Sequence, residues 1–134
     1  MGHKREKAGI MKVIDSDIFI DALRGAEKAE TWIKRAIGNG EGAFSSITET
    51  ELLSGNACND KEKREALLHF LSMLTKISVD NPIAQIAGDF RRNYKISLPD
   101  AIIAATAFHL SAALVTRNSK GFSAIKEIKL EVPY

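Results

Sequence analysis

The stretch "KVIDSDIFIDALRG", residues 12–25, decides how the chain begins to fold. A short apolar run, which reads as a buried strand, ends directly at Asp15. Ser16 is suited to cap a helix that runs to Arg24, and Gly25 follows as a helix terminator. An ionised carboxylate is costly to bury unless it is paired or binds a cation. The acid at the end of this strand therefore needs an explanation beyond the core.

Strand and helix patterns alternate along the rest of the chain. Further strands are expected at residues 42–47, 75–79, 112–116 and 128–132, with helical patterns between them. Strands separated by helices form parallel sheets with helices on both faces. The helix predicted for residues 97–111 is rich in alanine and nearly all apolar, so we expect it at the centre. With no internal repeat or linker, residues 11–134 are predicted to form one domain, preceded by a flexible basic arm, residues 1–10.

Composition narrows the class of protein. The chain has 134 residues, of which 45% are hydrophobic, and a formal net charge of +2. These values are typical of a globular domain with a real core, and they exclude disorder as the default. A single cysteine, Cys58, permits no intrachain disulfide and fits a reducing cytoplasm. The longest apolar stretch, residues 101–115, is too short and too polar to cross a membrane. We therefore expect a cytoplasmic protein without a membrane segment.

Polar side chains come directly after or soon after the carboxyl ends of the predicted strands. In open parallel sheets, ligands bind at this edge. Asp15 ends the first strand, Glu51 lies one turn into the helix after the second, and Asp100 opens the alanine-rich helix. Asn118 comes just after the strand at residues 112–116. Two carboxylates ~4 Å apart repel by roughly 4 kcal/mol at an effective dielectric constant near 20. Such a cluster needs protons or a cation, and hard oxygen ligands suit Mg²⁺ or Mn²⁺.

Each acid also has a purely structural interpretation. Helix N-termini favour acids, and a capping box pairs a hydroxyl residue with an acid three positions later. Three capping boxes are compatible with the sequence: Ser97 with Asp100, Thr48 with Glu51, and Ser46 with Glu49. Asp17 and Asp21 also suit the start of a helix. Capping leaves Asp15 unexplained, because it precedes the expected cap at Ser16.

Three stretches together resemble the PIN-domain proteins, and most closely the VapC-type toxins of prokaryotic toxin–antitoxin pairs. They are "VIDSDIFIDALRG", "SSITETELLSG" and "ISLPDAIIAATAFHLSAALVTRNSKGF". The resemblance implies an α/β fold, a three-layer α/β/α sandwich with a mostly parallel central sheet. It implies a divalent-metal-dependent ribonuclease with acidic roles at Asp15, Glu51 and Asp100. It also implies a homodimer and an antitoxin partner whose tail fills the active-site groove.

The chain departs from the family pattern in one segment. The family commonly supplies a fourth acid within "TRNSKGF", where this chain has Asn118 and Gly121. Asn118 is expected to ligate the metal through its carbonyl, without adding negative charge. Asp17 stands where the family often has Asn. Glu49 is not the motif glutamate, because the motif acid directly precedes the apolar pair Leu52-Leu53.

Other residues complete the predicted ribonuclease site. The hydroxyls of Ser16 and Thr116 are expected to position metal-bound water or phosphate. The cations expected to contact the RNA backbone are Arg24, Arg117 and Lys120. Two alternatives stay open. One is a non-catalytic RNA- or protein-binding module with a degenerate site; the other is a phosphotransferase of the haloacid-dehalogenase type, with Asp15 as nucleophile.

Overall fold

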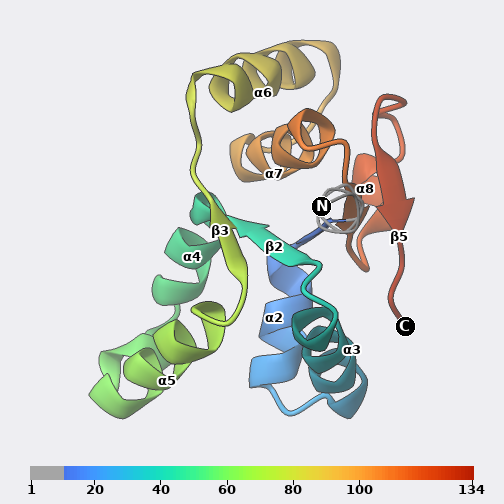
Figure 1. Ribbon diagram of the computed structural model, residues 1–134. Coiled ribbons are helices and arrows are strands. Elements are labelled where there is room, and N and C mark those ends of the chain that lie inside the picture. Colours follow the sequence, from blue (N-terminus) through green and yellow to red (C-terminus); the bar gives the residue numbers. More distant parts are fainter. Residues whose placement is uncertain (1–10) are drawn as a thin grey trace, which may run out of the picture.

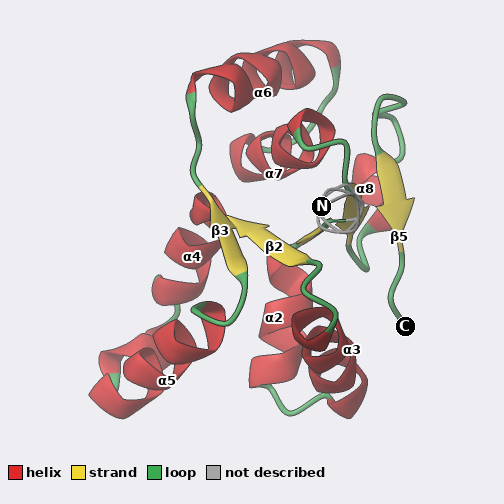
Figure 2. Ribbon diagram, viewed as in Figure 1, coloured by secondary structure: helices red, strands yellow, loops and turns green. Residues whose placement is uncertain are grey.

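The computed structural model describes residues 11–134, so the arm expected at residues 1–10 lies outside the described residues. Figures 1 and 2 show a sheet between two groups of helices. The strands are β1 (Lys12–Ile14), β2 (Gly42–Ser45), β3 (Thr75–Ile77), β4 (Ala113–Val115) and β5 (Lys129–Glu131). Their order in this five-stranded sheet is β3-β2-β1-β4-β5, and every pairing is parallel. The expected α/β/α sandwich is confirmed.

Two layers of helices cover the sheet. One layer is formed by α6 (Asn81–Asn93) and α7 (Leu98–His109), and the other contains α2 (Ser16–Leu23) and α3 (Glu27–Gly38), as Figure 1 shows. The remaining helical segments are α4 (Ser46–Leu53), η1 (Asn56–Asn59), α5 (Lys61–Leu71) and α8 (Ser119–Phe122). Of these, α4 packs against both α2 and α7, so it joins the two layers. This position brings α4 to the carboxyl end of the sheet.

The side chains of the central strands alternate between the two faces of the sheet and so contribute to both halves of the core. Successive side chains of a strand point to opposite faces of the sheet. Val13 and Leu114 accordingly pack with α6 and α7, whereas Ile14 and Val115 pack with α2 and α3. The edge strands β3 and β5 are only partly buried. The central strands therefore carry most of the sheet's apolar burial.

Helix α7 lies at the centre, as its composition predicts. Six of its residues are buried: Ala101, Ile103, Ala104, Ala105, Thr106 and Ala107. A helix that is apolar all round is buried on several sides, and alanine side chains let neighbouring backbones approach closely. The one buried hydroxyl, that of Thr106, donates to the carbonyl of Ile102 at 2.8 Å. The helix contacts β1, β2 and β4, the three central strands of the sheet.

Aromatic packing fixes α2 to the sheet. The ring of Phe19 is fully buried and meets Phe44 edge to face at 5.9 Å between centroids. It meets Phe70 of α5 in the same way at 6.2 Å. Edge-to-face pairs add roughly 0.5–1.5 kcal/mol each beyond the area that they bury. The first turn of α2, which begins directly after β1, is therefore rigidly placed.

The boundary between β2 and α4 differs from the sequence prediction. The strand expected at residues 42–47 ends at Ser45, and α4 begins at Ser46 rather than Thr48. The Oγ of Ser45 accepts from the backbone N–H of Ile47 at 3.2 Å and starts the helix. The capping boxes Thr48–Glu51 and Ser46–Glu49 are therefore wrong. A hydroxyl residue at the very end of the strand competes for the cap and starts the helix earlier.

Among the helices within residues 11–134, we find none with the length and apolar character needed to cross a membrane.

Candidate active site

Asp15 occupies the junction between β1 and α2. Its backbone N–H donates to Val115, and its side chain is the N-cap of α2, with Oδ1 accepting from the N–H of Ser16 at 2.8 Å. The predicted cap, Ser16, is therefore wrong by one residue. The hydroxyl of Thr116, at the end of β4, donates to Asp15 Oδ2 at 2.8 Å. Only 5% of the residue is exposed.

Burial dominates the electrostatics of Asp15. Desolvation is the largest cause that raises the pKa of Asp15 from 3.8 to about 7, and the negative charge of Asp17 is the next. The hydrogen bonds from Thr116 and Ser16 lower the pKa, but by less. A carboxyl group with such a pKa is easily kept protonated in the absence of a cation. Asp15 therefore has the raised pKa that is expected of a carboxyl group that binds a positive ion, and not of one that only caps a helix.

Glu51 reaches the same point from α4. The hydroxyl of Ser16 lies 3.2 Å from Glu51 Oε1 and 3.4 Å from Asp15 Oδ1, so it links the two carboxylates. Partial burial raises the pKa of Glu51, and the charge of Asp100 adds to the effect. The neighbouring acid behaves differently, because Glu49 forms an ion pair with Lys76 at 3.2 Å. This geometry supports the choice of Glu51 over Glu49.

Asp100 comes from the first turn of α7. Its backbone N–H donates to the Oγ of Ser97 at 3.3 Å, so the predicted cap by Ser97 is confirmed. The carboxylate is half-buried, and burial raises its pKa. Its charge in turn raises the pKa values of Asp15 and Glu51. The structure therefore brings these three acids, from three distant segments, within electrostatic reach of one another.

A fourth acid, Asp17, lies beside Asp15. Its Oδ2 accepts from the backbone N–H of Arg117 at 3.0 Å and lies 3.4 Å from the hydroxyl of Thr116. Its Oδ1 is buried and has no hydrogen-bond partner among residues 11–134. Burial raises the pKa of Asp17 as well. From the sequence it was expected only to favour the helix N-terminus; the signal for more was its spacing of two residues from Asp15.

Asn118 has a structural task in the turn after β4. Its Oδ1 accepts from the N–H of Gly121 at 3.3 Å and caps the short helix α8. Its own N–H donates to the hydroxyl of Thr116 at 2.9 Å. Gly121 is in close contact, since a Cβ there would lie 2.4 Å from the Asn118 amide nitrogen. Ligation of a cation by Asn118 would therefore compete with the cap.

The three predicted RNA-binding cations are all exposed, but they lie in different places. Arg117 follows β4 directly, where its guanidinium lies 3.5 Å from Asp21 and 5.0 Å from the centre of the Tyr134 ring. Lys120 lies close by in α8. Arg24 stands at the far end of α2, about 13 Å from Asp15 by the rise of the helix. The structure therefore places the backbone of Arg117 at Asp17 and Lys120 in the short helix that follows. The backbone of Arg24 lies at the opposite end of α2 from Asp15.

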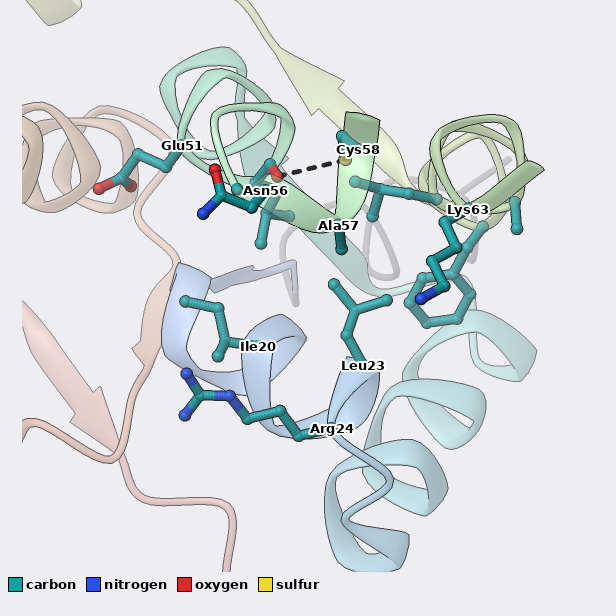
Figure 3. A pocket seen from close by; sticks show the side chains of 13 residues that line it. Ile20, Leu23, Arg24, Glu51, Asn56, Ala57, Cys58 and Lys63 are labelled. Atoms are coloured by element: carbon teal, nitrogen blue, oxygen red, sulfur yellow. Dashed lines mark hydrogen bonds between the residues drawn. The ribbon is translucent and has the colours of Figure 1, made fainter. Parts of the chain in front are cut away.

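An apolar cavity of about 580 Å³ adjoins the acids. Figure 3 shows it between α2 on one side and α4, η1 and α5 on the other, with Glu51 at one end and Lys63 toward the other. Ile20 and Leu23 of α2 form one wall, and the guanidinium of Arg24 is turned back along this helix toward Ile20. The cavity therefore leads from an apolar surface to the edge of the acid cluster.

Strands β1 to β4 and the three acids Asp15, Glu51 and Asp100 fall within one matched region. A sequence model of the PIN domain matches residues 12–128, which include Asp15, Glu51 and Asp100. This chain belongs to the PIN-domain family. The membership agrees with the parallel sheet and leaves the haloacid-dehalogenase alternative without support.

Relatives of this PIN domain cover nearly its whole length. Ribonuclease VapC19 of Mycobacterium tuberculosis is 35% identical over 130 residues, which cover 92% of this chain and 100% of the relative. Ribonuclease VapC10 of the same species is 33% identical over 124 residues. A chain in a toxin–antitoxin complex from Klebsiella pneumoniae is 34% identical, with a TM-score of 0.73 and coverage of 92% of this chain and 98% of that one. VapBC2 from Rickettsia felis, solved with a DNA fragment from its promoter, matches with a TM-score of 0.79 and 25% identity.

The donors at this PIN-domain site suit a hard divalent cation. Asp15, Glu51 and Asp100 offer carboxylate oxygens whose charges are unfavourable to one another. Within residues 11–134, no group of three or more acidic, histidine or cysteine side chains lies close enough together to hold a metal ion in the structure as it stands. Mg²⁺ does not require such a group, because it binds through one or two carboxylates and keeps several waters. The residues therefore fit an open site for Mg²⁺ or Mn²⁺.

Proposed function

We propose that this PIN domain is an endoribonuclease of the VapC toxin type, which hydrolyses RNA phosphodiester bonds with the help of Mg²⁺ or Mn²⁺. The observation that carries the proposal is the hydroxyl of Ser16, which contacts both Asp15 and Glu51. The charge of Asp100 acts on the same two carboxylates. Relatives with the name ribonuclease, similar over nearly the whole chain, support the reaction class.

The proposed chemistry needs a cation, a water molecule and a phosphate at one point. When bound, the cation would lower the pKa of a water molecule and polarise a phosphoryl oxygen. Asp15, Glu51 and Asp100 would hold the cation, and Ser16 would keep the first two carboxylates in register. Thr116, which donates to Asp15, would fix the orientation of that carboxylate. In-line attack would leave a 5′-phosphate and a 3′-hydroxyl.

RNA requires positive charge next to the acids, because the acids repel phosphates. Arg117 and Lys120 are the cations nearest to the cluster along the turn that follows β4. The contact of Arg117 with Asp21 and Tyr134 restricts its position and would lower the entropy lost on binding a phosphate. Arg24 would contact a more distant part of the RNA along the cavity. An RNA substrate also fits the cytoplasmic location that the single cysteine indicates.

An antitoxin is the proposed protein partner. The toxin–antitoxin complex that contains a chain 34% identical to this one supports this partner. A peptide laid in the apolar cavity would end next to Glu51, so a basic side chain at its end would pair with the acid cluster. Such a contact would block the proposed site without any change of fold. The homodimer stays a prediction from the resemblance.

The two glutamates of α4 provide the test of the site. Glu51→Gln should lower Mg²⁺-dependent cleavage of RNA by at least about a hundredfold, because loss of a catalytic electrostatic group typically costs this much. The matched control, Glu49→Gln, should cleave within about twofold of the original, because Glu49 is paired with Lys76 away from the cluster. Cleavage of a labelled RNA, with added Mg²⁺ and with chelator, measures both.

The reverse result, an inactive Glu49 variant and an active Glu51 variant, would mean that the wrong face of α4 has been chosen. No cleavage by the unaltered protein, under any divalent cation, would instead favour the alternative of a non-catalytic binding module.

Asn118 allows a separate prediction about the cation. Because its Oδ1 already accepts from Gly121, Asn118→Asp should retain the cap and leave Mn²⁺ affinity within about twofold. Isothermal titration of Mn²⁺ into both proteins measures the affinity. A clear gain in affinity, together with lower stability in chelator, would show instead that the added carboxylate joins the cluster.

A further inference from the structure

Asp17 has no role in the proposed function above, yet it touches the elements that hold Asp15. We propose that Asp17 is a positioning residue of the cation site, a fourth carboxylate that strengthens divalent-cation binding by its charge and by holding the end of β4 against α2. This inference rests on the proposed cation site at Asp15, Glu51 and Asp100.

The contacts of Asp17 join two parts of the chain that are 100 residues apart. Its Oδ2 accepts from the backbone N–H of Arg117 at 3.0 Å, and the hydroxyl of Thr116 lies 3.4 Å from the same oxygen. Thr116 is fully buried and donates to Asp15 at 2.8 Å. Asp17 therefore holds the backbone directly after Thr116, the residue that orients Asp15.

A proton count shows that these contacts do not satisfy both acids. A threonine hydroxyl carries one proton, so Thr116 can donate to Asp15 or to Asp17 but not to both at once. The shorter distance assigns this proton to Asp15. The N–H of Arg117 is then the donor left to Asp17 Oδ2, while its Oδ1 is buried without a partner in the described part of the chain. An ionised carboxylate with such an oxygen is costly unless positive charge lies nearby.

The next acid on α2 provides the contrast. Asp21 lies one turn further along the helix, where its Oδ2 accepts from the hydroxyl of Tyr134 at 2.7 Å and lies 3.5 Å from the guanidinium of Arg117. The charge of Asp21 is therefore compensated within the protein. Asp17 has a neighbouring carboxylate, Asp15, in place of a cation.

The segment after β4 makes the charge of Asp17 more important. Residues 117–121 contain no carboxylate, and the side-chain oxygen of Asn118 is engaged in the cap of α8. Asp17 meets the backbone of this segment through the N–H of Arg117, whereas Asp21 contacts the guanidinium of Arg117. A cation held by Asp15 would offset the charge of Asp17 at the same time.

Titration of Mn²⁺ into the full chain, without RNA, tests the inference. Asp17→Asn should bind Mn²⁺ roughly 10–100-fold more weakly, the loss usual when a residue that supports metal ligands is changed. The control Asp21→Asn, which removes the same charge one turn away, should bind within about twofold of the original. In chelator, Asp17→Asn should melt at a higher temperature than the original, because a buried like charge is removed. Asp17→Ser serves as a second neutral variant in case the first does not fold.

The outcomes separate the possible failures. Equal Mn²⁺ affinity in the original and the Asp17 variants would overturn the inference. If the variants also melt at a lower temperature in chelator, the role of Asp17 is purely structural. An original protein that binds no Mn²⁺ would overturn both the cation site and this inference. If the original binds Mn²⁺, the variants bind it weakly, and the original cleaves no RNA, the inference stands and the proposed ribonuclease fails.

Discussion

Asp15→Asn should abolish RNA cleavage and at the same time make the metal-free protein more stable. Several kcal/mol of transition-state charge stabilisation depend on a bound cation, and loss of that amount lowers the rate by roughly a thousandfold or more. The fold should persist, because the amide oxygen of asparagine can still accept from the N–H of Ser16. The stability gain follows from the 5% exposure of Asp15 and its neighbour Asp17, since a neutral side chain avoids the cost of a buried charge.

Two measurements check this prediction. Cleavage of a labelled RNA with Mg²⁺ gives the activity, and thermal melts at pH 8 in chelator give the stability. A gain of several degrees in melting temperature is expected. A variant that cleaves like the original would remove Asp15 from the active site, and a variant that melts lower in chelator would show that its ionised form stabilises the fold.

The stability of the metal-free protein should fall as the pH rises from about 4 to about 8. Burial and the charge of Asp17 raise the pKa of Asp15 to about 7 in the folded state, above its ordinary value of 3.8. Between these two values the folded protein holds a proton that the unfolded chain has released. Raising the pH through this range therefore removes stability, up to roughly 4 kcal/mol in total at about 1.4 kcal/mol per unit of pKa. The raised pKa values of Asp17, Glu51 and Asp100 act in the same direction.

Urea unfolding in chelator across this pH range measures the effect, with Asp15→Asn as the matched control. The difference in free energy of unfolding between the two proteins should be near zero at pH 4 and grow to its full value by pH 8. Saturating Mn²⁺ should remove most of it, because a bound cation keeps Asp15 ionised in the folded state. A difference that is constant with pH would mean that Asp15 does not titrate between pH 4 and pH 8.

Local patterns in the sequence were sufficient for the architecture and for part of the site. The apolar run before Asp15 and the nearly apolar helix at residues 98–109 report directly on burial, because a segment that is apolar on all sides must be covered by protein. The cap at Ser97 was likewise predictable, since a cap depends on residues within one helical turn. The position of Asp15 at the end of a buried strand favoured a bound cation, because the expected cap at Ser16 left it without another role; in the structure its side chain also caps α2.

Only the tertiary structure decided which polar groups meet. The contact of Ser16 with Glu51 joins residues 35 apart, and those of Asp17 with Thr116 and Arg117 join residues 99 and 100 apart. The contacts of Asp17 depend on the register of β1 with β4, in which Ile14 pairs with Val115. A one-residue change of register would turn each side chain to the opposite face of the sheet. No local pattern encodes that register.

The same limit explains the residues whose roles changed. Glu49 and Glu51 have similar sequence surroundings, and Lys76 on the neighbouring strand β3 is what draws Glu49 away from the cluster. Asn118 is suitable as a ligand or as a cap; in the structure its Oδ1 caps α8 by accepting from the N–H of Gly121, and its role as a metal ligand stays a prediction. Residue type and spacing determined which side chains could bind a cation. The packing of α2, α4 and α7 around the sheet decided which of these side chains lie close together. The sequence alone does not give this, because charges interact through space and not along the chain.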